Sequence, residues 1–240
     1  MRLGKLIVGL LVLCFNPVLA QELTASLLLE KAITFHDPSG NWPTYKGQLA
    51  ITMTSPDTKT RTSEIVIDLP KQYFELTVTT EGNTLGYIVD HEVCSLSLNG
   101  SNTYSEAEAN TNRLTCERAK TMKNYYTYLY GLPMKLRDPG TIIDPKVKRK
   151  TFKGKEYLVL KVNYEKEVGD DTWYFYFDPL TYAMEIYQFY HDEAKNDGEY
   201  ILLSGTVTAS GILMPKTRAW YTNKDNKHLG TDVLIEAVSR

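Results

Sequence analysis

Three short segments of the sequence bring an imidazole next to a carboxylate: His36-Asp37, Asp90-His91-Glu92 and His191-Asp192-Glu193. Zinc accepts both groups as ligands, and acid–base catalysis uses both. The spacing is not specific, because no HExxH pair or other close pair of ligands on one helix occurs. A metal-dependent hydrolase is therefore the least favoured of three functions considered, and we predict no metal ligands. His36 and Asp37 are instead expected to end a helix and to set the turn after it.

Other catalytic patterns are also missing from the sequence. It contains no GxSxG nucleophile motif and no glycine-rich phosphate loop. The acidic residues are spread over turns, so no glycosidase-type pair can be read from their spacing. We predict that the protein is not an enzyme, with no catalytic residues and no cofactor.

Residues 1–20 have the pattern of a secretory signal peptide. Arg2 and Lys5 precede the apolar run 6–15, and Val18-Leu19-Ala20 forms a small-residue cleavage site. The alternative is a lipoprotein signal that acylates Cys14, but Leu13 stands where that signal normally has Gly, Ala or Ser. The apolar run is shorter than the roughly 20 residues of a transmembrane helix. We expect export across the inner membrane, with the periplasm as the destination.

Two cysteines, Cys94 and Cys116, remain once the signal is removed. An even pair in an oxidising compartment predicts a disulfide, and the alternative is two unlinked thiols. The removed segment contains two basic residues and no acidic one, so 25 basic residues remain against 29 acidic ones. A net charge of −4 on the exported chain provides no electrostatic attraction for nucleic acid, and we predict no such partner.

The segment Asp171–Asp192 predicts the central β-hairpin. Side chains alternate across a strand, so Trp173, Phe175 and Phe177 share one face while Tyr174 and Tyr176 share the other. Asp178-Pro179 favours a turn between the two strands. We expect the Trp/Phe face to form the floor of a concave sheet and the tyrosine face to lie on its outer side.

The rest of the chain predicts more hairpins and two helices. Helical spacing of apolar residues predicts helices over 24–35 and 112–130, the second with a cluster of tyrosines, Tyr125, Tyr126, Tyr128 and Tyr130. This cluster is expected either to pack in the core or to form a lid over a pocket. Pro215 predicts an edge or a bulge in its strand. The fold class is mainly β (α+β): one strongly curved antiparallel sheet of about 10–11 strands, a half-barrel with both helices covering its concave face.

Several segments resemble known families. Gly154-Lys155-Glu156-Tyr157 and Trp173–Pro179 followed by Thr181 are similar to a strand pair of the LolA/LolB-type periplasmic lipoprotein carriers. More closely, the chain resembles a secreted family from Bacteroidota without assigned activity, through the following segments: His36-Asp37-Pro38, Tyr190-His191-Asp192 and Pro215–Arg218 with Trp220-Tyr221. The carrier resemblance implies one LolA-like half-barrel domain over 21–240 that shelters acyl chains.

The function expected from these observations is non-catalytic binding of a lipid or lipid-modified polypeptide in an apolar cavity. The expected lining combines the sheet floor with helix residues: Leu28, Phe35, Tyr125, Leu129, Trp173, Phe175 and Phe177. Each of these residues could instead belong to a solid core. The alternative function is an envelope-associated structural or interaction module with a filled interior. Transient contact with the envelope membrane or a receptor is also expected of a carrier, and the oligomeric state is left open.

Overall fold

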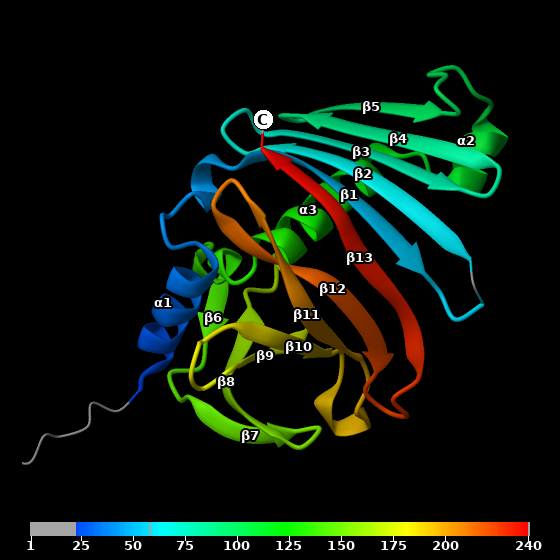
Figure 1. Cartoon of the computed structure of the whole chain (residues 1–240). Coiled ribbons are helices and arrows are strands. Elements are labelled where there is room, and N and C mark those ends of the chain that lie inside the picture. The colour runs from blue at the N-terminus through cyan, green and yellow to red at the C-terminus, as the bar shows by residue number, and fades with distance from the viewer. Residues whose placement is uncertain (1–22, 58, 240) are drawn as a thin grey trace, which may run out of the picture.

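The computed structural model describes residues 23–57 and 59–239, so the predicted signal peptide and Cys14 lie outside the described residues. The described chain forms one curved, unclosed antiparallel sheet (Figure 1), which confirms the predicted fold class. It has thirteen strands rather than 10–11. These strands are β1 (Lys46–Thr54), β2 (Thr60–Asp68), β3 (Tyr73–Thr80), β4 (Asn83–Asp90), β5 (Val93–Leu98), β6 (Thr141–Ile143), β7 (Lys148–Phe152), β8 (Lys155–Tyr164), β9 (Thr172–Phe177), β10 (Met184–Tyr190), β11 (Glu199–Ala209), β12 (Ile212–Thr222) and β13 (His228–Ser239).

The order of the strands determines the path of the chain. The sheet runs β5-β4-β3-β2-β1-β13-β12-β11-β10-β9-β8-β6, with β7 also paired to β8. The first and last strands therefore meet in the middle, with Gly47 opposite Ser239 and Thr54 opposite Thr231. The connection from β5 to β6 must pass from one edge of an unclosed sheet to the other. It does so through the helical segment that crosses the concave side in Figure 1.

Helix α1 (Ala25–His36) begins and ends close to the predicted positions. The Thr24 side chain caps it by accepting a hydrogen bond from the Leu27 N–H at 3.2 Å. At the other end, both carboxylate oxygens of Asp37 accept backbone N–H groups, from Asn41 at 2.7 Å and from Trp42 at 2.8 Å. The short 3-10 turn Trp42–Thr44 follows. Asp37 thus sets the turn after the helix, as the sequence predicts.

The second predicted helix is present over nearly its predicted length, and a short additional helix precedes it. A short α2 (Glu106–Asn112) ends at Arg113, which adopts a left-handed conformation, and α3 then runs from Cys116 to Gly131. Ser105 and Glu108 form a capping box at the start of α2. The 3-10 turns Met134–Arg137 and Glu193–Lys195 complete the helical segments of the described residues.

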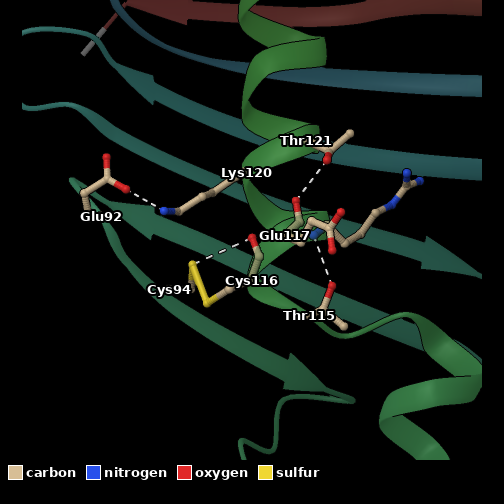
Figure 2. Close-up of a disulfide and its surroundings, with 8 residues drawn as sticks. Glu92, Cys94, Thr115, Cys116, Glu117, Lys120 and Thr121 are labelled. Carbon is tan, nitrogen blue, oxygen red and sulfur yellow. Dashed lines mark hydrogen bonds and ion pairs between the residues drawn. A yellow bond between two sulfur atoms is a disulfide. The ribbon is translucent and has the colours of Figure 1, made fainter. Parts of the chain in front are cut away.

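Helix α3 is fastened to the concave face along its length. At its first turn, Cys116 forms a disulfide with Cys94 of the edge strand β5, and their Cα atoms are 5.6 Å apart (Figure 2). The Lys120–Glu92 ion pair in Figure 2 links α3 to the turn just before β5. Further along, Tyr126 stacks on Phe74 and donates a hydrogen bond to the Ser63 hydroxyl at 3.2 Å. Near its end, the Leu129 carbonyl accepts a hydrogen bond from Arg218 of β12 at 3.2 Å.

The central hairpin separates two hydrophobic clusters. Phe175 and Phe177 of β9 belong to the main core on the concave side. Tyr174 and Tyr176 lie on the outer side, as predicted, yet they are only 5% and 2% exposed. They pack with Tyr157, Val159 and Ile186, and Phe152 from β7 contacts Tyr176 edge-on. The tyrosine face is therefore a small second core rather than a solvated surface, because β7 lies over it.

Candidate ligand-binding site

A cavity of about 540 Å³ lies between α3 and one end of the concave face. Its apolar wall consists mainly of aromatic side chains from α3, β9, β10 and β12: Tyr125, Tyr128, Leu129, Trp173, Phe189 and Trp220. Charged and titratable side chains complete the lining: Arg61, Asp171, His191, Glu199 and Asp232. The cavity thus combines a largely apolar wall with a few polar groups, as small-molecule sites commonly do.

Two further cavities adjoin the first. One of about 630 Å³ shares Tyr125, Tyr128, Asp171 and Trp173 with it and extends toward Tyr164 of β8. Another of about 430 Å³ shares Met53 and Arg61 and extends toward the β1–β2 turn. Because they share lining residues, the three cavities lie next to one another. We call the end of the concave face that they occupy, beside Tyr125 and Trp173, the open end of the half-barrel. The volumes lie within the roughly 300–1,000 Å³ typical of ligand sites.

The aromatic wall is positioned by strand alternation and by α3. Trp173 and Phe189 are paired across β9 and β10, and their rings stack with centroids 4.8 Å apart. From α3, Tyr128 meets Trp173 edge-on at 5.6 Å, and Tyr125 stacks on Trp220 at 6.5 Å. Trp220 in turn donates an indole N–H to the Asp232 carboxylate at 2.8 Å. These contacts hold the rings in place around the cavity.

Burial controls the ionisation of the polar groups. Burial raises the pKa of the Asp232 carboxyl, and it likewise raises that of Glu199. The hydrogen bond with Asp171, 2.6 Å from Nδ1 of His191, raises the pKa of that imidazole. Burial also holds the pKa of the Tyr125 and Tyr128 hydroxyls well above their usual value. Both tyrosines are therefore neutral at physiological pH and cannot serve as anionic bases there.

A model of a known protein family matches nearly the whole chain. Residues 5–237 match a family of unknown function, DUF6503. The chain belongs to DUF6503. No curated protein matches it.

Several solved structures resemble the chain at low sequence identity. A LolA superfamily protein from Nitrosomonas europaea superposes with a TM-score of 0.52 and 11% identity, over 90% of this chain and 94% of that protein. A putative outer membrane lipoprotein-sorting protein domain from Vibrio parahaemolyticus has a TM-score of 0.48 and 11% identity, over 87% of this chain and 90% of that one. A DUF1329 family protein from Desulfovibrio piger has a TM-score of 0.49 and 6% identity, over 89% and 92%. The first likeness shows that this DUF6503 chain has a LolA-like fold, which confirms the resemblance of fold.

The predicted lining residues fall into two groups in this DUF6503 chain. Tyr125, Leu129 and Trp173 lie together on the wall of the 540 Å³ cavity. Leu28, Phe175 and Phe177 are fully buried in the core and line none of the three cavities. Phe35 is half-buried at the end of α1, where its ring contacts His36 edge-on at 5.0 Å. The tyrosine cluster is likewise divided, since Tyr126 and Tyr130 are buried whereas Tyr125 and Tyr128 line the cavities.

Sequence reasoning missed several residues of the cavity wall: Arg61, Phe189, Trp220 and Asp232. A signal for the charged ones exists in the alternation of their strands. Arg61 is in phase with the inward-facing Ile65 and Ile67 of β2, and Asp232 is in phase with Leu234 of β13. A charged residue in phase with buried apolar ones marks a polar group on the inner face of a sheet.

The histidine–carboxylate segments do not converge. His36 is buried at the end of α1, His91 contacts its neighbour Asp90 at 2.7 Å, and His191 contacts Asp171. Within residues 23–57 and 59–239, no three His, Cys, Asp or Glu side chains are placed to hold a metal ion. Over the same residues, no helix combines the length and apolarity needed to cross a bilayer.

Proposed function

We propose that this DUF6503 protein is an exported, non-catalytic binding protein. It holds the apolar chain of a lipid or a lipid-modified polypeptide at the open end of its half-barrel. One observation carries the proposal: a cavity of about 540 Å³ with Trp173, Phe189 and Trp220 on its wall. Burying an acyl chain there gains about 0.8 kcal/mol for each methylene group removed from water.

Two further observations support this reading. The chain shares its fold with a LolA superfamily protein, and residues 1–20 have the pattern of a signal for export to the periplasm. A carrier in that compartment would make transient contact with the envelope membrane or with a receptor. Because three adjoining spaces lie along the open end, an apolar chain can lie along the end of the sheet rather than pass through its core.

The tryptophans of the chain provide a direct test. Trp173 and Trp220 line the cavity, whereas Trp42 is buried elsewhere beside Tyr45. A long-chain methyl ester with a spin label on its chain should quench the fluorescence of the wild-type protein. The quenching should persist in Trp42→Phe and fall strongly in the double variant Trp173→Phe/Trp220→Phe.

Native mass spectrometry of protein isolated from its own envelope supplies the second measurement, and we expect bound lipid. If repeated preparations contain no lipid and the ester quenches no tryptophan, the carrier proposal is wrong. An interaction module that binds through its surface would then become the favoured function.

A further inference from the structure

Arg61 occupies an unusual place in the sheet for an arginine. Met53 of β1 is paired with Arg61 of β2 on one side and with Asp232 of β13 on the other. The three side chains therefore form a row across the concave face, since directly paired residues project from the same side of a sheet. Arg61 borders both the 540 Å³ cavity and the adjoining 430 Å³ cavity. Its guanidinium thus lies where the two spaces meet.

Part of the hydrogen-bonding capacity of Arg61 is unused in the described part of the chain. Its Nε atom is buried and has no acceptor among residues 23–57 and 59–239. No carboxylate in that part of the chain forms an ion pair with it. A guanidinium has five N–H donors and stays charged at every physiological pH. Leaving such donors without acceptors is costly, so an external acceptor would stabilise the site.

In the described part of the chain, none of the acidic side chains that line the cavity accepts a hydrogen bond from Arg61. Asp171 is bound to His191, and Asp232 accepts the indole N–H of Trp220. Burial raises the pKa of Asp232 and of Glu199, and the charges of Arg61 and Arg218 partly oppose this rise at Asp232. Asp232 forms no ion pair with Arg61 among the described residues, since the two lie two strands apart. The remaining cation near the row, Arg218, is fully buried and donates to the carbonyls of Pro215 and Leu129. Its Nε also lacks an acceptor among the described residues, but Arg218 lines none of the three cavities. Arg61 is therefore the cavity cation that still offers its N–H donors.

We propose that Arg61 binds the anionic headgroup, a carboxylate or phosphate, of the amphiphile whose chain lies against Trp173, Phe189 and Trp220. This inference rests on the proposed carrier function and specifies its ligand class. The planar fork of the guanidinium matches the two oxygens of a carboxylate or phosphate. The apolar wall provides affinity for the chain, and Arg61 selects amphiphiles with a negative headgroup over neutral ones.

The experiment compares a spin-labelled stearate with its methyl ester at pH 8, both followed by quenching of Trp173 and Trp220. The wild-type protein should bind the stearate about tenfold more tightly than the ester, as expected for one charge-assisted contact. Arg61→Gln should remove this preference, so that the ratio of stearate to ester affinity falls to about one. Arg61→Lys, which retains the charge but not the fork, should retain part of it. Arg149→Gln is the matched control, because Arg149 lies on β7 and pairs with Glu156 outside the cavity.

The possible outcomes separate the two proposals. Equal binding of acid and ester by the wild type, or a preference that survives Arg61→Gln, overturns the role of Arg61 and leaves the carrier function standing. Failure of both probes to bind overturns the carrier function and this inference with it. Inorganic phosphate and butyrate distinguish a headgroup from a free anion. Neither should displace the stearate at millimolar concentration, and displacement would show that the site takes a free anion instead.

Discussion

The two ends of the concave face differ, although the same strands build both. Strand β9 contributes Phe175 and Phe177 to the packed end, where both are fully buried, and Trp173 to the cavity at the open end. At the packed end, α1 lies against β12 and His36 joins the two. At the other end, α3 passes over the sheet without filling the space beneath it, and Tyr125 and Tyr128 lie beside the cavities. The comparison shows that one alternating pattern makes a core where the covering helix packs directly on the sheet and a site where the helix leaves a cavity.

The two ends also differ in the hydrogen bonds made by two of their polar side chains, His36 and Arg61. The His36 ring bridges two strands, with Nδ1 2.8 Å from the Leu213 carbonyl and Nε2 accepting the Met184 N–H at 3.0 Å. Both of its nitrogens are thus used, as is the carboxylate of Asp37. At the open end, the Nε of Arg61 has no acceptor in the described part of the chain. Unsatisfied buried polar atoms also occur in the core, among them the Tyr45 hydroxyl, but of those in the described part of the chain Arg61 Nε belongs to a side chain that lines the cavity.

The largest effect should come from truncating Phe177 at the packed end. Phe177→Ala removes a fully buried ring, so we expect the free energy of unfolding to fall by about 3–5 kcal/mol. Trp173→Ala at the open end should cost less than half as much, because Trp173 borders a cavity, yet it should weaken binding of the methyl ester. Urea unfolding and fluorescence titration measure the two quantities. A larger loss of stability in Trp173→Ala would reverse the assignment of the two ends.

The disulfide should have the next largest effect, because it fastens the start of α3 over the concave face. Cys94 and Cys116 are separated by 22 residues, and closing a loop of that length stabilises the folded state by about 3 kcal/mol in the chain-entropy model. We expect the double variant Cys94→Ser/Cys116→Ser to unfold at a correspondingly lower urea concentration. Wild-type protein unfolded under reducing conditions is the control. Indistinguishable midpoints for the oxidised and reduced proteins would contradict the prediction.

The stability of the folded protein should also depend on pH through His36. Burial lowers the pKa of His36 below 6.5, and the nearby Arg218 charge adds to this effect, while the bond to the Leu213 carbonyl opposes it. The unfolded chain then binds a proton at a higher pH than the folded protein does. The contribution of His36 is therefore complete above pH 6.5 and is lost as the pH falls through the lowered value, by at most about 1.4 kcal/mol per pH unit.

Separate substitutions of His36 and His191 distinguish the pH dependence of the packed end from that of the open end. His36→Gln should flatten the fall in stability between pH 6.5 and pH 5. His191→Gln should have a small effect of opposite sign, because the pKa of His191 is raised by Asp171 and its contribution is lost as the pH rises. Urea midpoints measured across this range provide the comparison. An unchanged pH profile in His36→Gln would show that the imidazole does not anchor the packed end through its neutral form.

The smallest effect should follow a change of charge at the open end. Asp232→Asn retains an oxygen for the Trp220 indole N–H and removes a carboxyl group two strands from Arg61. We expect stability to change by less than about 1 kcal/mol, and stearate to bind a few-fold more tightly while the methyl ester is unaffected. Parallel titrations of both probes measure this. Weaker stearate binding would indicate that Asp232, rather than Arg61 alone, contacts the headgroup.

The sequence alone determined the local elements of this protein. The helical stripe with its Thr24 cap, the Asp37 turn, the cysteine pair and the period-2 strands could all be predicted, because each depends on residues close together in the chain. The curved antiparallel sheet followed from the number of short hairpins. Pro215 lies in β12, which is a central strand of the sheet. The proline is tolerated there because the pairing of β12 with β13 begins only at Thr217, so no neighbour on that side needs an N–H group from residue 215. The short helix α2 was missed, because its seven residues, Glu106–Asn112, have no apolar stripe and none of them is buried.

Only the tertiary structure decided which part of the concave face is filled and which is open. That outcome depends on where α1 and α3 pack, and these helices contact strands distant in sequence. The row of Arg61, Met53 and Asp232 exists because the first and last strands of the sheet pair in one register. Alternation can place a side chain on the inner face. Whether it then meets a core or a cavity depends on the long-range contacts that cover that face.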